Sequence, residues 1–237
     1  MAYGCQPWGT GLGFRWNPQK DRDAGAIPRE AAMITMRARF AAAGFCAGIL
    51  RFGVAEASLV ASEDGDAVYD TVNDVTWLAN ANLAQTKSFG VSGINPDGSM
   101  SWTTAQEWIA AMNAANYLGS RHWSLPAAKL PDDTCSQMPK AAAFGYDCVG
   151  SQMGYLYYHE LGGVKGSTIQ LQHDASYRLF NNFQPYLYWS STLWTHVPNS
   201  AFSFSFGNGF QGTNVFVNAM YAMAVAPGKV GFRSSNH

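Results

Sequence analysis

The side chains that could do chemistry do not form a recognised catalytic motif. His159-Glu160 begins like the zinc-binding helix of metalloproteases, but Gly163 stands where that helix needs its second histidine. The sequence contains no Gly-x-Ser-x-Gly nucleophile turn and no phosphate-binding glycine loop. None of the five histidines pairs with another at metal-ligand spacing: His122, His159, His173, His196 and His237. The residues therefore favour a protein that is not an enzyme and that needs no metal or cofactor.

A pair of carboxylates is the remaining route to catalysis, because two such groups can serve as general acid and general base. The candidates are Glu107, Asp132, Asp133 and Glu160. The sequence sets no distance between them, so a hydrolase stays open as a minor alternative.

Residues 33–57 have the three parts of a secretory signal peptide. These parts are a basic start with Arg37 and Arg39, an apolar run over Phe40–Leu50, and the small-x-small end Ala55-Glu56-Ala57. The apolar run is too short to anchor the chain in a bilayer. We expect cleavage after Ala57, and a buried Ala-rich helix is the alternative.

The rest of the chain divides around this leader. Residues 1–32 are expected to be a non-native upstream extension, and residues 58–237 a single exported domain. Residues 1–57 hold seven of the 15 basic and four of the 16 acidic residues, so 58–237 keeps 8 basic and 12 acidic residues, a net charge of −4. An acidic domain offers no electrostatic basis for binding nucleic acid. It has no second apolar run long enough to span a membrane, and we expect a secreted, periplasmic or cell-surface protein.

Cysteine usage agrees with export. Only Cys135 and Cys148 follow the leader, and in an oxidising compartment we expect them to form one disulfide. A metal site would need two more soft ligands, which the flanking sequence does not offer.

The pattern of apolar residues predicts an α+β domain. One helix is expected to begin near Ser101 or Thr103, with Ala105, Trp108, Ile109 and Met112 on its apolar face. A second helix is expected over Ser151–Leu161. Three short strands are expected early in the domain, at Leu59-Val60, Ala67–Asp70 and Val75–Leu78.

The last third of the chain turns to β-structure. A strand is expected over Tyr186–Thr192, and Ala201–Phe206 alternates so that three phenylalanines share one face. Gly207-Asn208-Gly209 predicts a hairpin. Val215-Phe216-Val217 and Tyr221–Val225 are expected to complete this antiparallel, hairpin-rich sheet.

Several segments, taken in order, resemble the Lcl C-terminal domain family, which is named for a bacterial collagen-like adhesin. The opening signature is Val68–Leu83. The later segments are Ser101–Asn113, His122–Pro126, Gly154–Gly163, Tyr188–Thr192 and Phe206–Gly209. The resemblance covers roughly residues 66–228. It implies a C-type-lectin-like fold and, from the adhesin, the binding of glycans or other surface ligands. The chain has no collagen-like stalk, and its acidic charge disfavours sulfated glycans.

We expect the binding residues on the loops of the final sheet. Trp77, Trp102, Trp108, Trp123 and Trp189 lie inside matched motifs and are expected in the core. The candidate ligand-binding residues are Trp194, His196, Asn208, Phe210, Gln211 and Asn214, because exposed rings stack on sugars and amides pair with hydroxyls. The alternative is that these loops are simply variable surface.

The sequence thus predicts an exported, non-catalytic binding module for a glycan or another extracellular surface ligand, with oligomers possible. A structural or matrix protein without a defined ligand is the second hypothesis.

Overall fold

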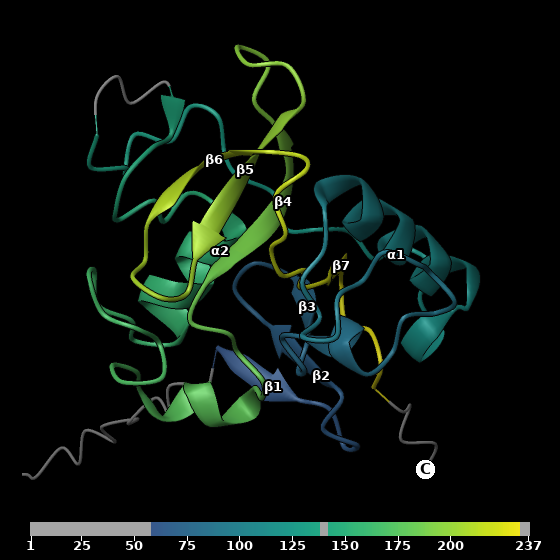
Figure 1. Ribbon diagram of the computed structural model, residues 1–237. Coiled ribbons are helices and arrows are strands. Elements are labelled where there is room, and N and C mark those ends of the chain that lie inside the picture. The colour runs from purple at the N-terminus through teal and green to yellow at the C-terminus, as the bar shows by residue number, and fades with distance from the viewer. Residues whose placement is uncertain (1–57, 138–141, 233–237) are drawn as a thin grey trace, which may run out of the picture. The chain divides into compact units, whose positions relative to one another are not determined.

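The computed structural model describes residues 58–137 and 142–232, which form an α+β unit with two antiparallel sheets (Figure 1). The expected extension at 1–32 and leader at 33–57 lie outside the described residues. The first sheet has the order β1-β2-β3-β7, and the second has the order β4-β5-β6. Their bounds are β1 Leu59–Ala61, β2 Ala67–Asp70, β3 Val75–Leu78, β4 Leu187–Leu193, β5 Ser200–Ser205, β6 Gln211–Val215 and β7 Val225–Pro227.

The first predicted helix is confirmed as α1, Trp102–Ala114. Ser101 is its N-cap, and the serine Oγ accepts a hydrogen bond from the backbone N–H of Thr104 at 3.1 Å. The helix buries the four residues of the expected apolar face. Those residues pack into a cluster with Trp123 and Trp189.

The second predicted helix consists of two joined parts. The α-helical turn α2, Gln152–Tyr155, continues as the π-helix η4, Leu156–Glu160. Together they bury Leu156 and Tyr157 in a second core cluster, with Phe204 and Phe206 of the late sheet. The described residues also form three short 3-10 helices: η1 Leu83–Gln85, η2 Tyr117–Gly119 and η5 Ala175–Leu179.

Strand β5 is buried on both faces. Its phenylalanines form the buried face that the alternation predicts, and Ser203 and Ser205 on the other face are also buried. The hairpin predicted at Gly207–Gly209 joins β5 to β6 in antiparallel register.

The predicted course of Tyr221–Val225 is wrong, because this segment does not complete the late sheet. Tyr221 still bridges to Tyr188, with its N–H donating to Leu187 O at 3.0 Å. The chain then leaves the late sheet, and β7 pairs with β3 through Trp77 and Val225. A short buried run pairs equally well with either sheet, so its local pattern does not identify its partner. The segment therefore links the two sheets.

Four of the five tryptophans expected in the core are buried: Trp77, Trp108, Trp123 and Trp189. Trp102 is half-buried, stacks on Phe216 and donates its indole N–H to Ser190 O. Within residues 58–137 and 142–232, no helix is long and apolar enough to cross a membrane.

Candidate binding surface

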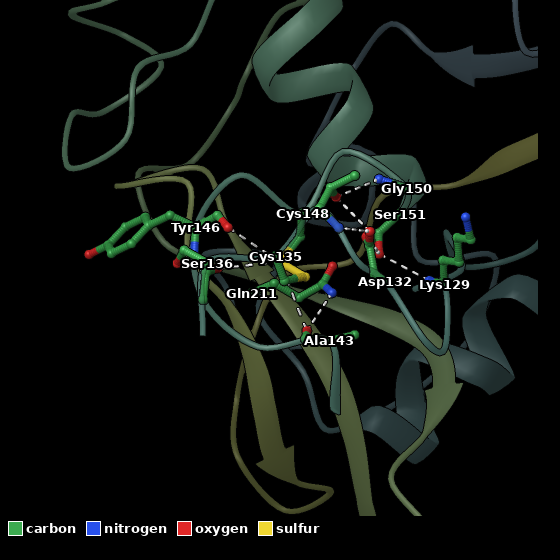
Figure 2. The surroundings of a disulfide bond; sticks show 12 residues. Lys129, Asp132, Cys135, Ser136, Ala143, Tyr146, Cys148, Gly150, Ser151 and Gln211 are labelled. Carbon is green, nitrogen blue, oxygen red and sulfur yellow. Dashed lines mark hydrogen bonds between the residues drawn. A yellow bond between two sulfur atoms is a disulfide. The ribbon is translucent and has the colours of Figure 1, made fainter. Parts of the chain in front are cut away.

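The expected disulfide between Cys135 and Cys148 is present, and both cysteines are buried (Figure 2). The bridge lies in a small apolar cluster with Phe202 of β5. It closes a loop within the segment between the two helices, and this loop packs against Phe202 of the late sheet.

Asp132 beside the disulfide has a structural role. Its buried carboxylate accepts hydrogen bonds from the N–H and the hydroxyl of Thr134, at 3.1 and 2.5 Å, and from the Ser151 hydroxyl at 3.3 Å (Figure 2). Asp132 and the two cysteine sulfurs lie within 4.8 Å of one another. Metal binding needs thiolates, and the disulfide occupies both sulfurs. The carboxylate thus stabilises the loop that carries the bridge.

The disulfide-closed loop is joined directly to the β5–β6 hairpin. Gly145 and Gln211 exchange two backbone hydrogen bonds, at 2.8 and 2.9 Å. The Gln211 side chain donates to Ala143 O at 2.8 Å (Figure 2). Next to this pairing, the Tyr146 ring meets the Phe210 ring edge-to-face at 5.3 Å.

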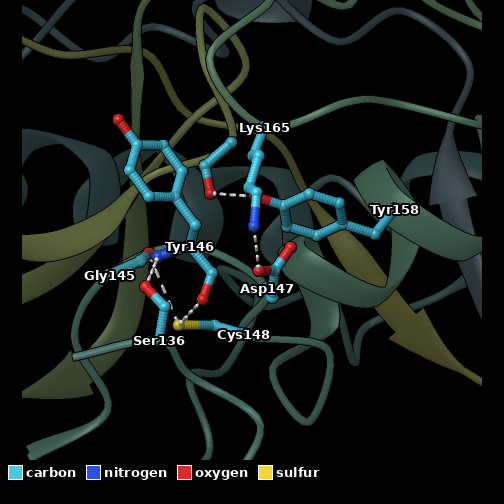
Figure 3. A network of polar contacts seen from close by, with 8 residues as sticks. Ser136, Gly145, Tyr146, Asp147, Cys148, Tyr158 and Lys165 are labelled. Carbon is cyan, nitrogen blue, oxygen red and sulfur yellow. Dashed lines mark hydrogen bonds and ion pairs between the residues drawn. The ribbon is translucent and has the colours of Figure 1, made fainter. Parts of the chain in front are cut away.

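Two further contacts surround the hairpin tip (Figure 3). The Tyr158 hydroxyl donates to Gly209 O at 2.9 Å, and burial raises the pKa of Tyr158 to about 12, so the hydroxyl stays protonated. Lys165 pairs with Asp147 at 3.3 Å. Both partners of that pair are well exposed to solvent, so it contributes little stability. The tip is held by Tyr158, by the Gly145–Gln211 pairing and by the Gly166 N–H, which donates to Asn208 O at 2.8 Å.

A pocket of about 330 Å³ opens at this tip. It is lined by Pro185, Tyr186, Leu187, Ser205, Gly207, Asn208 and Phe210. Tyr186 is 53% exposed, and Asn208 and Phe210 are half-buried. The Asn208 Oδ1 accepts the Phe210 N–H at 3.0 Å. Its Nδ2 has no hydrogen-bond partner among the described residues. The pocket thus combines two aromatic rings with an amide donor.

The six predicted binding residues do not form one site. Trp194 and His196 lie in the β4–β5 connection, whereas Asn208 and Phe210 lie in the β5–β6 connection at the opposite end of the sheet (Figure 1). Strand β5 has six residues, which separates the two ends by about 20 Å.

Two of the six predicted side chains are committed to the protein itself. Gln211 is 1% exposed, so the expectation that it faces a ligand is corrected: its amide is used inside the molecule. Asn214 is half-buried and donates to the Ser203 hydroxyl at 2.9 Å. Only Asn208 and Phe210 line the pocket.

Trp194 is a packing residue as well as a surface residue. Its half-buried ring stacks on His196 at 4.2 Å and meets Phe144 and Phe202 edge-to-face at 5.2 and 5.6 Å. It packs against the disulfide cluster. The ring is therefore partly used in packing inside the protein.

Sequence reasoning missed Tyr186 and Tyr146. Tyr186 falls two residues before buried Tyr188, and strand alternation assigns both to the core. The strand begins at Leu187, after Pro185, so Tyr186 is free to face solvent. Pro185 is the signal that could have placed it outside the strand.

These observations define an α+β domain with one disulfide and a small aromatic pocket on a hairpin tip. Residues 66–226 match the model of the Lcl C-terminal domain, which is more than half of the chain. The protein therefore belongs to the Lcl C-terminal domain family. No curated protein matches the sequence, and no solved structure matches it.

Proposed function

We propose that residues 58–237 form an exported, non-catalytic module that binds a glycan or a similar extracellular ligand at the hairpin-tip pocket. The observation that carries the proposal is the pairing of Tyr186 and Phe210 with the amide of Asn208 in one pocket. Sugar rings present C–H faces that pack on aromatic rings, and hydroxyls that accept from amides. We also propose that the fold is C-type-lectin-like, which the two helices and two antiparallel sheets support.

The pocket suits a neutral ligand. Its lining residues carry no formal charge, and residues 58–237 are acidic overall, which disfavours sulfated polymers. The nearby Lys165 is paired with Asp147. Neutral oligosaccharides are therefore the preferred class of ligand.

A glycan array probed with protein expressed from the full chain tests the proposal. We expect saturable binding to one class of neutral glycan, and Tyr186→Ala should weaken it about tenfold, or about 1.4 kcal/mol. Tyr186 is half exposed, so its truncation should leave the melting temperature nearly unchanged.

His196→Ala is the matched control, since it removes an exposed ring at the opposite end of the sheet. Its binding should equal that of the wild type. Binding by Tyr186→Ala as strong as that of the wild type would refute the proposed site. No saturable binding would favour a structural or matrix protein, and turnover of a bound glycan would favour a hydrolase.

A further inference from the structure

Glu160 is a buried carboxyl group with no cation bound to it. It is 4% exposed and ends the π-helix η4. Its Oε2 accepts a hydrogen bond from the hydroxyl of Ser58. Among residues 58–137 and 142–232, no lysine, arginine or histidine nitrogen lies within ion-pair distance of it. A buried carboxylate without a partner is costly, and a paired one is stabilised.

The charges around Glu160 are mostly negative. Burial raises the pKa of Glu160, the Ser58 hydrogen bond opposes that rise, and the charges of Asp70 and Asp174 add to it. The adjacent His159 lowers the pKa by a smaller amount. On the other side, burial raises the pKa of Tyr155, and so do the charge of Glu160 and a side-chain hydrogen bond to it. A positive charge beside Glu160 would therefore oppose the effect of burial on its carboxylate.

Asp70 does not share this need, although it is 1% exposed. Its carboxylate accepts hydrogen bonds from the N–H of Val72, and from the N–H and side-chain amide of Asn73, at 2.6 to 2.9 Å. Asp174 accepts the N–H of Ser176 at 2.8 Å, at the start of η5. Among the described residues, Glu160 is therefore the one carboxylate of the three that accepts no backbone N–H, and it is buried.

Ser58 is held firmly beside this group. Its carbonyl oxygen accepts both the N–H and the hydroxyl of Thr71, at 2.8 and 3.1 Å. Strand β1 begins at the next residue and lies against η5 (Figure 1). The Ser58 nitrogen is attached to the same Cα as the side chain that reaches Glu160. Standard bond lengths therefore keep this nitrogen within about 6 Å of the Glu160 carboxylate.

We propose that leader cleavage after Ala57 creates the missing cation, and that the new α-ammonium group of Ser58 forms an ion pair with Glu160. A leader peptidase would use water to break the Ala57–Ser58 amide bond. The hydroxyl of water goes to the Ala57 carboxyl group, and its hydrogen goes to the Ser58 amine, which takes a proton from solvent. An uncleaved chain keeps a neutral amide at this position. Processing would therefore stabilise the exported domain and not the precursor.

The inference uses the export that is part of the proposed function, but it does not depend on glycan binding. Its support from the sequence is the Ala55-Glu56-Ala57 cleavage pattern, which ends directly before Ser58. Its support from the structure is the position of Ser58 against a buried, unpaired carboxyl group.

The test begins with full-chain protein expressed in a bacterium and recovered outside the cytoplasm. Mass spectrometry should show Ser58 as the first residue. The α-amine is then labelled with trace acetic anhydride, and its rate of acetylation should be at least tenfold lower than in Glu160→Gln. Asp174→Asn is the matched control, because it removes an exposed carboxylate near the same site. It should change the rate less than twofold.

A second readout covers the case in which Glu160→Gln fails to fold. The pH dependence of labelling in wild-type protein gives the pKa of its α-amine, which is ordinarily about 7.7–8.0. Ion pairing should raise it by at least one pH unit. An ordinary pKa, equal labelling of wild type and Glu160→Gln, or a first residue other than Ser58 would each overturn the proposal. None of these results would affect glycan binding, so the two proposals fail separately.

Discussion

Removal of the Cys135–Cys148 disulfide should cost the domain a calculable part of its stability. The bridge spans a sequence separation of 13 residues. In the chain-entropy model, a loop of this length restricts the unfolded chain by about 3 kcal/mol. The double variant Cys135→Ala/Cys148→Ala loses this restriction. It also loses two buried sulfurs that pack near Phe202, so about 3–4 kcal/mol is expected in total.

The corresponding change in melting temperature follows from domain size. For a domain of this length, each kcal/mol shifts the midpoint by about 2–4 °C. The double variant should therefore melt about 6–16 °C below the wild type. Urea unfolding should show a lower midpoint with nearly the same slope, unless the unfolded state becomes more expanded without its cross-link.

Wild-type protein unfolded and refolded with a thiol reductant is the control, since it breaks the bridge and keeps both sulfurs. The reduced protein should lose only the stability that comes from restricting the unfolded chain, about 3 kcal/mol. A loss below about 1 kcal/mol in both samples would refute the reasoning. It would mean that the unfolded chain is already restricted in this region.

Three further substitutions test the packing around the site by urea denaturation. Gly154→Ala should destabilise the fold by more than about 2 kcal/mol, because its Cβ would lie 2.0 Å from Cys148 O. Gly166→Ala has open space but a φ of +82°, and should cost only about 1–2 kcal/mol. Trp194→Ala should lower the free energy of unfolding by about 2–3 kcal/mol, since the ring packs on Phe202. An unchanged urea midpoint would contradict this and would leave Trp194 as a surface residue that is free to bind a ligand.

Local patterns predicted the helices and most of the strands because those patterns report local burial. The apolar spacing of α1 matches the helical repeat, and its buried residues are the expected four. The partner of β7 was not predictable in this way. Val225 is buried in contact with β3, but nothing within its own run distinguishes one buried sheet from another. Pairing across some 150 residues depends on the packing of the whole domain.

The candidate site was predicted only in part, for a geometric reason. In an antiparallel sheet, successive hairpin connections fall at opposite ends. The loops of Trp194 and Phe210 are successive connections of the same three strands. This rule could have divided the six residues from the sequence alone. The contact of Tyr146 with Phe210 could not be predicted from the sequence, because it depends on where the disulfide-closed loop packs on the sheet.

The docking of that loop connects the two ends of the late sheet. The disulfide cluster contacts Trp194 and Phe202 toward the β4–β5 end. The same loop reaches the β5–β6 end through Gly145 and places Tyr146 on Phe210. The Tyr146 ring meets the Phe210 ring edge-to-face at 5.3 Å, so Tyr146 contributes to the position of the Phe210 ring. The disulfide-closed loop therefore supports one lining residue of the pocket, Phe210, although neither cysteine lines the pocket.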